Sequence, residues 1–100
     1  MNKMILVGRL IDDPKTEENK TIVTVSVPAS VKDENGEYPV DTIEVELFDN
    51  IAKNTAEYCK KGDVIGVKGR IQRRDDEPMK IVAEKVTFLT SRKGEEENYD

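Results

Sequence analysis

The fold is decided by residues 42–62, which read TIEVELFDNIAKNTAEYCKKG. Residues 42–48 alternate strictly, with Ile43, Val45 and Leu47 on one side and mostly polar residues on the other. A period of two residues is typical of a β-strand that buries one face. The pattern changes at once to a helical spacing, so this stretch predicts a strand that leads directly into a helix.

The helix is expected over residues 51–61, with Asp49 or Asn50 as its N-cap. Lys60 and Lys61 would lie in its last turn, and Gly62 would end it in the left-handed region. Its packing face is narrow and consists of small residues spaced three and four apart, namely Ala52, Thr55, Ala56 and Cys59. Cys59 is therefore predicted to be a small core residue.

The remaining strands follow from short β-rich runs bounded by turn residues. Asn35-Gly36 favours a type I′ hairpin turn, the segment from Asp12 to Lys20 reads as a polar loop, and Gly66 and Gly69 indicate coiling or close backbone approach. The four further strands are expected at residues 4–11, 21–27, 64–74 and 79–89. The order β-β-β-α-β-β predicts an all-β protein with one helix, folded as a five-stranded Greek-key barrel of the OB type.

Composition excludes several classes of function. The chain has 100 residues, enough for one domain, with no histidine and one cysteine. Histidine-based catalysis, a disulfide within the chain and a cysteine–histidine zinc site are therefore excluded. No apolar run approaches the roughly 20 residues that a membrane span requires, and no signal peptide is apparent. We expect a cytoplasmic protein that is not an enzyme and needs no metal or other cofactor.

The charge is unevenly distributed. The net charge is −5, and residues 94–100 hold four acids and no base, which leaves 17 acidic and 16 basic residues in the rest of the chain. We expect residues 1–90 to form the domain and residues 91–100 to form a short acidic tail. Since the body is nearly neutral, any binding of nucleic acid must depend on local patches.

The strand expected at residues 64–74 carries such a patch. The residues on its outward face are all basic or polar, namely Lys68, Arg70, Gln72 and Arg74. Arg73 is adjacent to them in the sequence. Lysine and arginine spaced along a strand can follow a phosphate backbone. The alternative is an ordinary solvated strand face whose charges pair across the sheet with Glu44 and Glu46.

Four segments resemble bacterial single-stranded DNA-binding proteins, in the same order and over about residues 1–90. They are residues 1–10 followed by Asp13-Pro14, residues 47–62, residues 67–74 and residues 82–89. The resemblance implies an OB-fold that binds single strands in an electropositive groove, stacks bases on aromatic rings and performs no catalysis. It also implies a homotetramer, or a homodimer, and recruitment of replication or repair proteins through the acidic tail. The alternatives for the tail are competition with DNA for the basic strand and a simple solubilising role.

The resemblance also implies which residues would contact DNA. Phe48 would stack a base, and the phosphates would be held by Lys3, Arg9, Lys61, Lys68, Arg70, Arg73 and Arg74. The alternative for Phe48 is that it packs under a loop or the helix. Tyr38 is either a displaced stacking residue or a structural residue at a loop end. The family usually has aromatic residues at the positions of Val31, Thr42 and Asp76, so the chain resembles a divergent, aromatic-poor member.

Two functions follow from these observations. The first is sequence-independent binding of single-stranded DNA in replication, recombination or repair, with weak and salt-sensitive affinity. The second is an OB-fold interaction or replication-accessory module that has lost strong DNA binding. In either case the first strand, with Ile5 and Val7 on one side, is where subunits are expected to pair.

Overall fold

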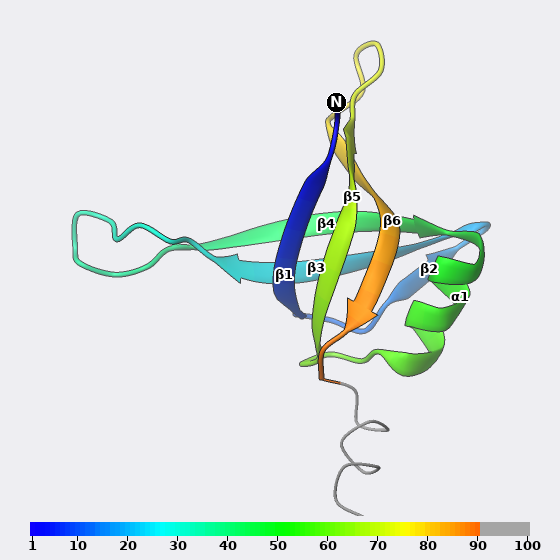
Figure 1. Cartoon of the computed structure of the whole chain (residues 1–100), viewed down its shortest axis with the longest axis horizontal. Coiled ribbons are helices and arrows are strands. Elements are labelled where there is room, and N and C mark those ends of the chain that lie inside the picture. Colours follow the sequence, from blue (N-terminus) through cyan, green and yellow to red (C-terminus); the bar gives the residue numbers. More distant parts are fainter. Residues whose placement is uncertain (91–100) are drawn as a thin grey trace, which may run out of the picture.

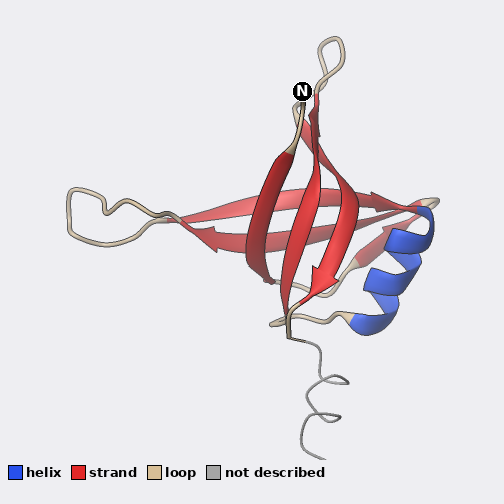
Figure 2. Ribbon diagram, viewed as in Figure 1, coloured by secondary structure: helices blue, strands red, loops and turns tan. Residues whose placement is uncertain are grey.

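The structure is a computed structural model, and it describes residues 1–90. The acidic tail predicted at residues 91–100 lies outside the described residues. Six strands and one helix follow one another along the chain (Figures 1 and 2). They are β1 (Met4–Leu10), β2 (Lys15–Glu17), β3 (Lys20–Pro28), β4 (Val40–Phe48), α1 (Asp49–Tyr58), β5 (Val64–Gln72) and β6 (Lys80–Phe88).

The strands close into a barrel. Their order is β1-β5-β6-β4-β3-β2, and an additional pairing of β1 with β3 joins the two sides. β4 and β6 run parallel, whereas the other pairs are antiparallel. In Figure 1, β1, β5 and β6 form one layer that crosses β3 and β4, and α1 lies at one side of the barrel. This confirms the predicted five-stranded OB barrel with its helix between the third and fourth barrel strands.

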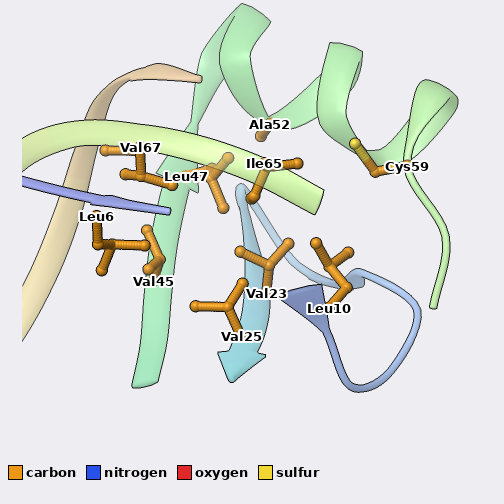
Figure 3. Packing of buried hydrophobic residues seen from close by; sticks show 11 residues of the cluster. Leu6, Leu10, Val23, Val25, Val45, Leu47, Ala52, Cys59, Ile65 and Val67 are labelled. Atoms are coloured by element: carbon orange, nitrogen blue, oxygen red, sulfur yellow. The ribbon is translucent and has the colours of Figure 1, made fainter. Parts of the chain in front are cut away.

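The core fills the space between the crossed layers (Figure 3). The alternation predicted for β3 and β4 is confirmed, because Val23, Val25, Val45 and Leu47 are fully buried. All five barrel strands contribute to the cluster, and the helix segment adds Ala52 and Cys59. The residues of the cluster are Leu6, Leu10, Val23, Val25, Val45, Leu47, Ala52, Cys59, Ile65, Val67 and Ala83.

Two local predictions were wrong. The segment expected as a loop contains β2, whose three residues are all exposed and pair with the beginning of β3. Because no side chain of β2 is buried, the strand leaves no apolar alternation in the sequence. At Asn35-Gly36, only Gly36 has a positive φ, of 79°. A type I′ turn needs positive φ at both central residues, so the hairpin closes differently.

The helix begins and ends earlier than expected. Its N-cap is Phe48 rather than Asp49 or Asn50, and no side-chain hydrogen bond caps it. Its last residue is Tyr58, because Cys59 takes an extended conformation. Lys60 and Lys61 therefore lie beyond the last turn, although Gly62 has the expected positive φ, of 96°. A turn closed by the buried carboxylate of Asp63, which accepts a hydrogen bond from the Lys60 amide at 2.9 Å, replaces the final helical turn.

The packing face of the helix is narrower than the spacing predicted. Ala52, Thr55 and Cys59 are buried, but Ala56 is exposed. Ala56 instead lines a hollow between the helix and the turn that joins β2 to β3. Burial of Cys59, reinforced by the negative charge of Asp63, raises the pKa of its thiol to about 11. The thiol is therefore protonated and weakly nucleophilic at neutral pH.

Thr55 offers a test of this packing. Its hydroxyl is fully buried and has no hydrogen-bond partner within residues 1–90. Replacing Thr55 with valine should raise the free energy of unfolding by about 1 kcal/mol, because the unpaired hydroxyl no longer has to be desolvated. Urea unfolding measures the change. The matched control is Thr21→Val, at a buried threonine whose hydroxyl lies 3.2 Å from that of Thr16. Equal effects of the two substitutions would contradict the explanation.

Gly69 permits the close contact of β5 with β6. A Cβ atom built on it would lie 2.2 Å from the carbonyl oxygen of Val82. The ladder shifts register at this point, because Lys68 pairs with Lys85 whereas Gly69 pairs with Ala83. The expected close backbone approach is thus confirmed for Gly69. At Gly66 it is not found, since a Cβ atom there would meet nothing nearer than 3.8 Å.

Candidate nucleic-acid interface

A groove of about 470 Å³ runs over the outer surface of the barrel. It is formed where the turn between β2 and β3 meets the outward faces of β4, β5 and β6. Its lining residues are Glu18, Asn19, Lys20, Glu46, Phe48, Arg70, Gln72, Arg74, Lys80 and Val82. Four of these are cations and two are carboxylates, so the groove is positively charged although the chain is not.

Phe48 is the last outward-facing residue of β4 and is half-buried. It lines the groove and also a second hollow of about 440 Å³ beside the first turn of α1. Arg70 and Val82 line both hollows as well. Phe48 therefore borders two adjoining open spaces, and a ring that stacks a base must be accessible from such a space.

Three predicted site residues meet in the groove, and two unpredicted cations join them. Phe48, Arg70 and Arg74 lie along it, as the alternation of their strands implied. Lys20 and Lys80 were missed because each begins a strand and neither belongs to a basic run. The pairing of β4 with β3 sets Lys20 opposite Phe48, and its pairing with β6 brings Lys80 to Glu46, two residues from Phe48.

Glu46 pairs with two cations of the groove, whereas the alternative pairing of the basic strand with Glu44 and Glu46 is not found. Strand β5 pairs with β1 and β6 rather than with β4, so its basic residues do not lie opposite Glu44 and Glu46. Instead, Glu46 lies 3.6 Å from Lys20 and 3.9 Å from Lys80, measured between oxygen and nitrogen. Arg70 lies 3.6 Å from Glu84, the extra residue at the register shift.

Lys3 and Lys68 lie on the neighbouring outer surface of β1 and β5. Lys68 is exposed and pairs in register with Ile5. Lys3 precedes β1, where the side chain of Asn2 holds the chain against β5 by hydrogen bonds with the backbone N–H and carbonyl of Ile71. Neither lysine lines the groove.

Arg9 and Lys61 lie at the other end of the barrel. Arg9 pairs in register with Val64, six residues from Arg70 along β5, which corresponds to about 20 Å. Its guanidinium donates a hydrogen bond to the carbonyl of Gly62 at 2.6 Å. The backbone amide of Lys61 donates to the carboxylate of Asp13 at 2.7 Å. The guanidinium of Arg9 is thus held away from Phe48, and the backbone of Lys61 is fixed at the same end of the barrel.

Arg73 and Tyr38 lie outside the groove as well. Arg73 is exposed and follows the end of β5. Tyr38 is 54% exposed and lies on the long hairpin between β3 and β4, which projects from the barrel in Figure 1. The ammonium of Lys32 lies 5.6 Å from its ring centroid. Ten residues of extended chain, about 30 Å, separate it from Phe48.

Within residues 1–90, no group of three or more potential metal-ligating side chains comes together. None of the helices described there has the length and apolar character needed to cross a membrane.

Comparison with known proteins places these features in context. Residues 1–91 match the model of the "Single-strand binding protein family". The chain is 35% identical to single-stranded DNA-binding protein 1 of Clostridium acetobutylicum, covering 93% of this chain and 97% of that protein. It is 42% identical to single-stranded DNA-binding protein B of Bacillus subtilis, covering 76% and 72% of the two chains.

Solved structures agree on the fold. The single-stranded DNA binding protein from Thermus aquaticus, crystallised as a deletion mutant, superimposes with a TM-score of 0.72 at 21% identity, covering 90% of this chain and 51% of that chain. A small single-stranded DNA-binding protein from Streptomyces coelicolor gives a TM-score of 0.65 at 16% identity, covering 86% and 90%. A closed barrel, a basic groove around one aromatic ring and a family match over nine-tenths of the sequence lead to one conclusion. The chain belongs to the single-strand binding protein family.

Proposed function

We propose that this chain binds single-stranded DNA, without sequence preference, in the groove around Phe48. One observation carries the proposal: a half-buried aromatic ring lies between two open hollows and beside Arg70 and Arg74. Every base has a π face that can stack on such a ring, whereas arginine can pair with any phosphate. A single ring among cations therefore supports binding that depends on charge and stacking rather than on base identity.

The cations outside the groove would act where the strand enters and leaves it. Lys3 and Lys68 adjoin Arg70 on the outer surface of β1 and β5. Arg73 adjoins Arg74, and Arg9 and Lys61 would contact only a longer strand that continues along the barrel. Tyr38 would stack a base only if the strand reached the projecting hairpin.

Fluorescence anisotropy of labelled oligo-dT tests the proposal at low and at moderate salt. We expect saturable binding for which duplex DNA competes poorly. The logarithm of the binding constant should fall by about 0.7 per phosphate neutralised for each tenfold increase in salt concentration. A salt dependence near zero would contradict phosphate binding. The absence of binding at low salt would favour the alternative, an accessory module that retains the barrel without the activity.

We infer a cellular role of the same kind. The protein would act passively, without catalysis, on single strands exposed during replication, recombination or repair in the cytoplasm. The acidic residues 91–100 would recruit partner proteins of those processes. Deletion of these residues should then abolish partner capture while leaving oligo-dT binding intact.

We also propose that the chain assembles as a homotetramer, or as a homodimer, through the outer face of β1. Ile5 and Val7 are 77% and 51% exposed on this face. Gly66 of β5 leaves the surface beside them flat, and Leu89 lies at its edge. Contiguous exposed apolar residues of this kind are typical of an interface between subunits.

The oligomer proposal has a direct test. Replacing both Ile5 and Val7 with aspartate should lower the mass measured by light scattering to that of a monomer, because buried carboxylates would face one another across the interface. Val31→Asp is the control, since Val31 is 73% exposed on the hairpin and away from this face. An unchanged mass in the double variant would rule out this interface.

A further inference from the structure

Glu46 occupies the middle of the groove, between two lysines from neighbouring strands. One of its oxygens, Oε1, lies 3.6 Å from the ammonium of Lys20, and the other, Oε2, lies 3.9 Å from that of Lys80. Its side chain is only 15% exposed, whereas that of Glu77, which also contacts Lys80, is 66% exposed. Glu46 is therefore a fixed part of the groove rather than a mobile surface acid.

This geometry resembles the way a phosphate would be held. Each oxygen of one anionic group faces one ammonium, as two oxygens of a phosphate would. Because the carboxylate is mostly shielded from solvent, counterions screen its charge less than they screen an exposed acid. A phosphate that enters the groove must therefore compete with Glu46 for the same two lysines and overcome its repulsion.

We propose that Glu46 limits the affinity of the groove for single-stranded DNA by acting as an internal substitute for a phosphate. The inference rests on the proposed function and adds a residue that sets its strength. Of the four groove cations, Lys20 and Lys80 are partly neutralised before DNA arrives. Arg74 and Arg70 then carry most of the attraction, although Arg70 is itself paired with the more exposed Glu84.

The test compares Glu46→Gln with the wild-type protein by oligo-dT anisotropy over a range of salt. Glutamine keeps the size of the side chain and removes its charge. We expect binding at low salt to tighten about 3- to 10-fold. The slope of the logarithm of the binding constant against the logarithm of salt concentration should steepen by about 0.7 for each ammonium that gains a phosphate contact.

Glu44→Gln is the matched control. Glu44 lies two residues away on the same outward side of β4, and the substitution changes the net charge equally, but Glu44 does not line the groove. It should give a clearly smaller gain. Equal gains would show that only the overall charge matters and would overturn the inference. Weaker binding by Glu46→Gln would show that Glu46 positions the lysines for DNA, which would also overturn it.

Lys20→Gln provides a second readout, because Glu46 is its ion-pair partner whereas Lys80 also contacts Glu77. If Glu46 neutralises Lys20, this substitution should weaken binding more in the Glu46→Gln background than in the wild-type protein, and thermal unfolding should show that each variant folds. Equal losses in both backgrounds would contradict the inference. Binding that appears only after Glu46→Gln would support it while overturning the proposed function. No binding by any of the proteins at low salt would overturn both.

Discussion

Phe48→Ala is expected to weaken oligo-dT binding by about 1–3 kcal/mol, the usual contribution of one stacked base. This corresponds to a loss of roughly 5- to 150-fold in affinity. The loss should be large here because Phe48 is the one aromatic residue among those lining the groove within residues 1–90. Anisotropy at low salt measures it, since the electrostatic contribution then keeps the weaker complex detectable.

Phe48→Leu separates stacking from packing. Phe48 is half-buried and precedes the first turn of α1, so alanine can also loosen the helix. Leucine fills much of the same volume but offers no π face. We expect Phe48→Leu to unfold close to the wild-type temperature and to bind nearly as weakly as Phe48→Ala. Wild-type affinity in the leucine variant would mean that Phe48 packs and does not stack.

Gly69→Ala is expected to have the largest effect on stability. Its Cβ atom would lie 2.2 Å from the carbonyl oxygen of Val82 and 3.2 Å from the Cα of Ala83, both in the backbone of β6. No side-chain rotation relieves such a contact, so β5 and β6 must separate. Overpacking of this kind costs about 1–3 kcal/mol and occasionally more. Urea unfolding should show a lower midpoint, or the variant should fail to fold.

Gly66→Ala is the matched control for this substitution. Gly66 lies three residues earlier in the same strand, and its nearest neighbour to an added Cβ atom is the Cδ1 of Leu89 at 3.8 Å, an ordinary contact. We expect its stability to stay within about 0.5 kcal/mol of the wild type. A comparable loss of stability in the two variants would contradict this explanation. It would show that any glycine of β5 is sensitive to substitution, whether or not it lies at the register shift.

The sequence predicted the barrel because its strands bury one face. In β3 and β4, valine, isoleucine and leucine alternate with polar residues, so local periodicity and the buried set agree. β2 escaped detection because it is held by backbone pairing with β3 and buries no side chain. The predicted C-terminus of α1 was about three residues too late. The sequence suggested a last helical turn that ends before Gly62, but a turn closed by the Asp63 carboxylate takes its place.

The candidate site was predictable only in part. Alternation within single strands indicated that Phe48 and Arg70 face outward. The same alternation places Glu46 beside Phe48 on the outward face of β4. It could not indicate that Lys20 and Lys80 join them, because that depends on the pairing of β4 with β3 and with β6. Local pattern alone also left open a pairing of the β5 cations with β4, which the strand order of the barrel excludes. Non-local strand order, rather than local pattern, determines the groove.

Photochemical cross-linking of bound oligo-dT, followed by mass spectrometry of the digested protein, tests the central claim most directly. If a base stacks on Phe48, the modified peptide should contain Phe48, and the signal should disappear in Phe48→Leu while the protein remains folded. Cross-links confined to the hairpin around Tyr38, or to the barrel end at Arg9 and Lys61, would contradict it.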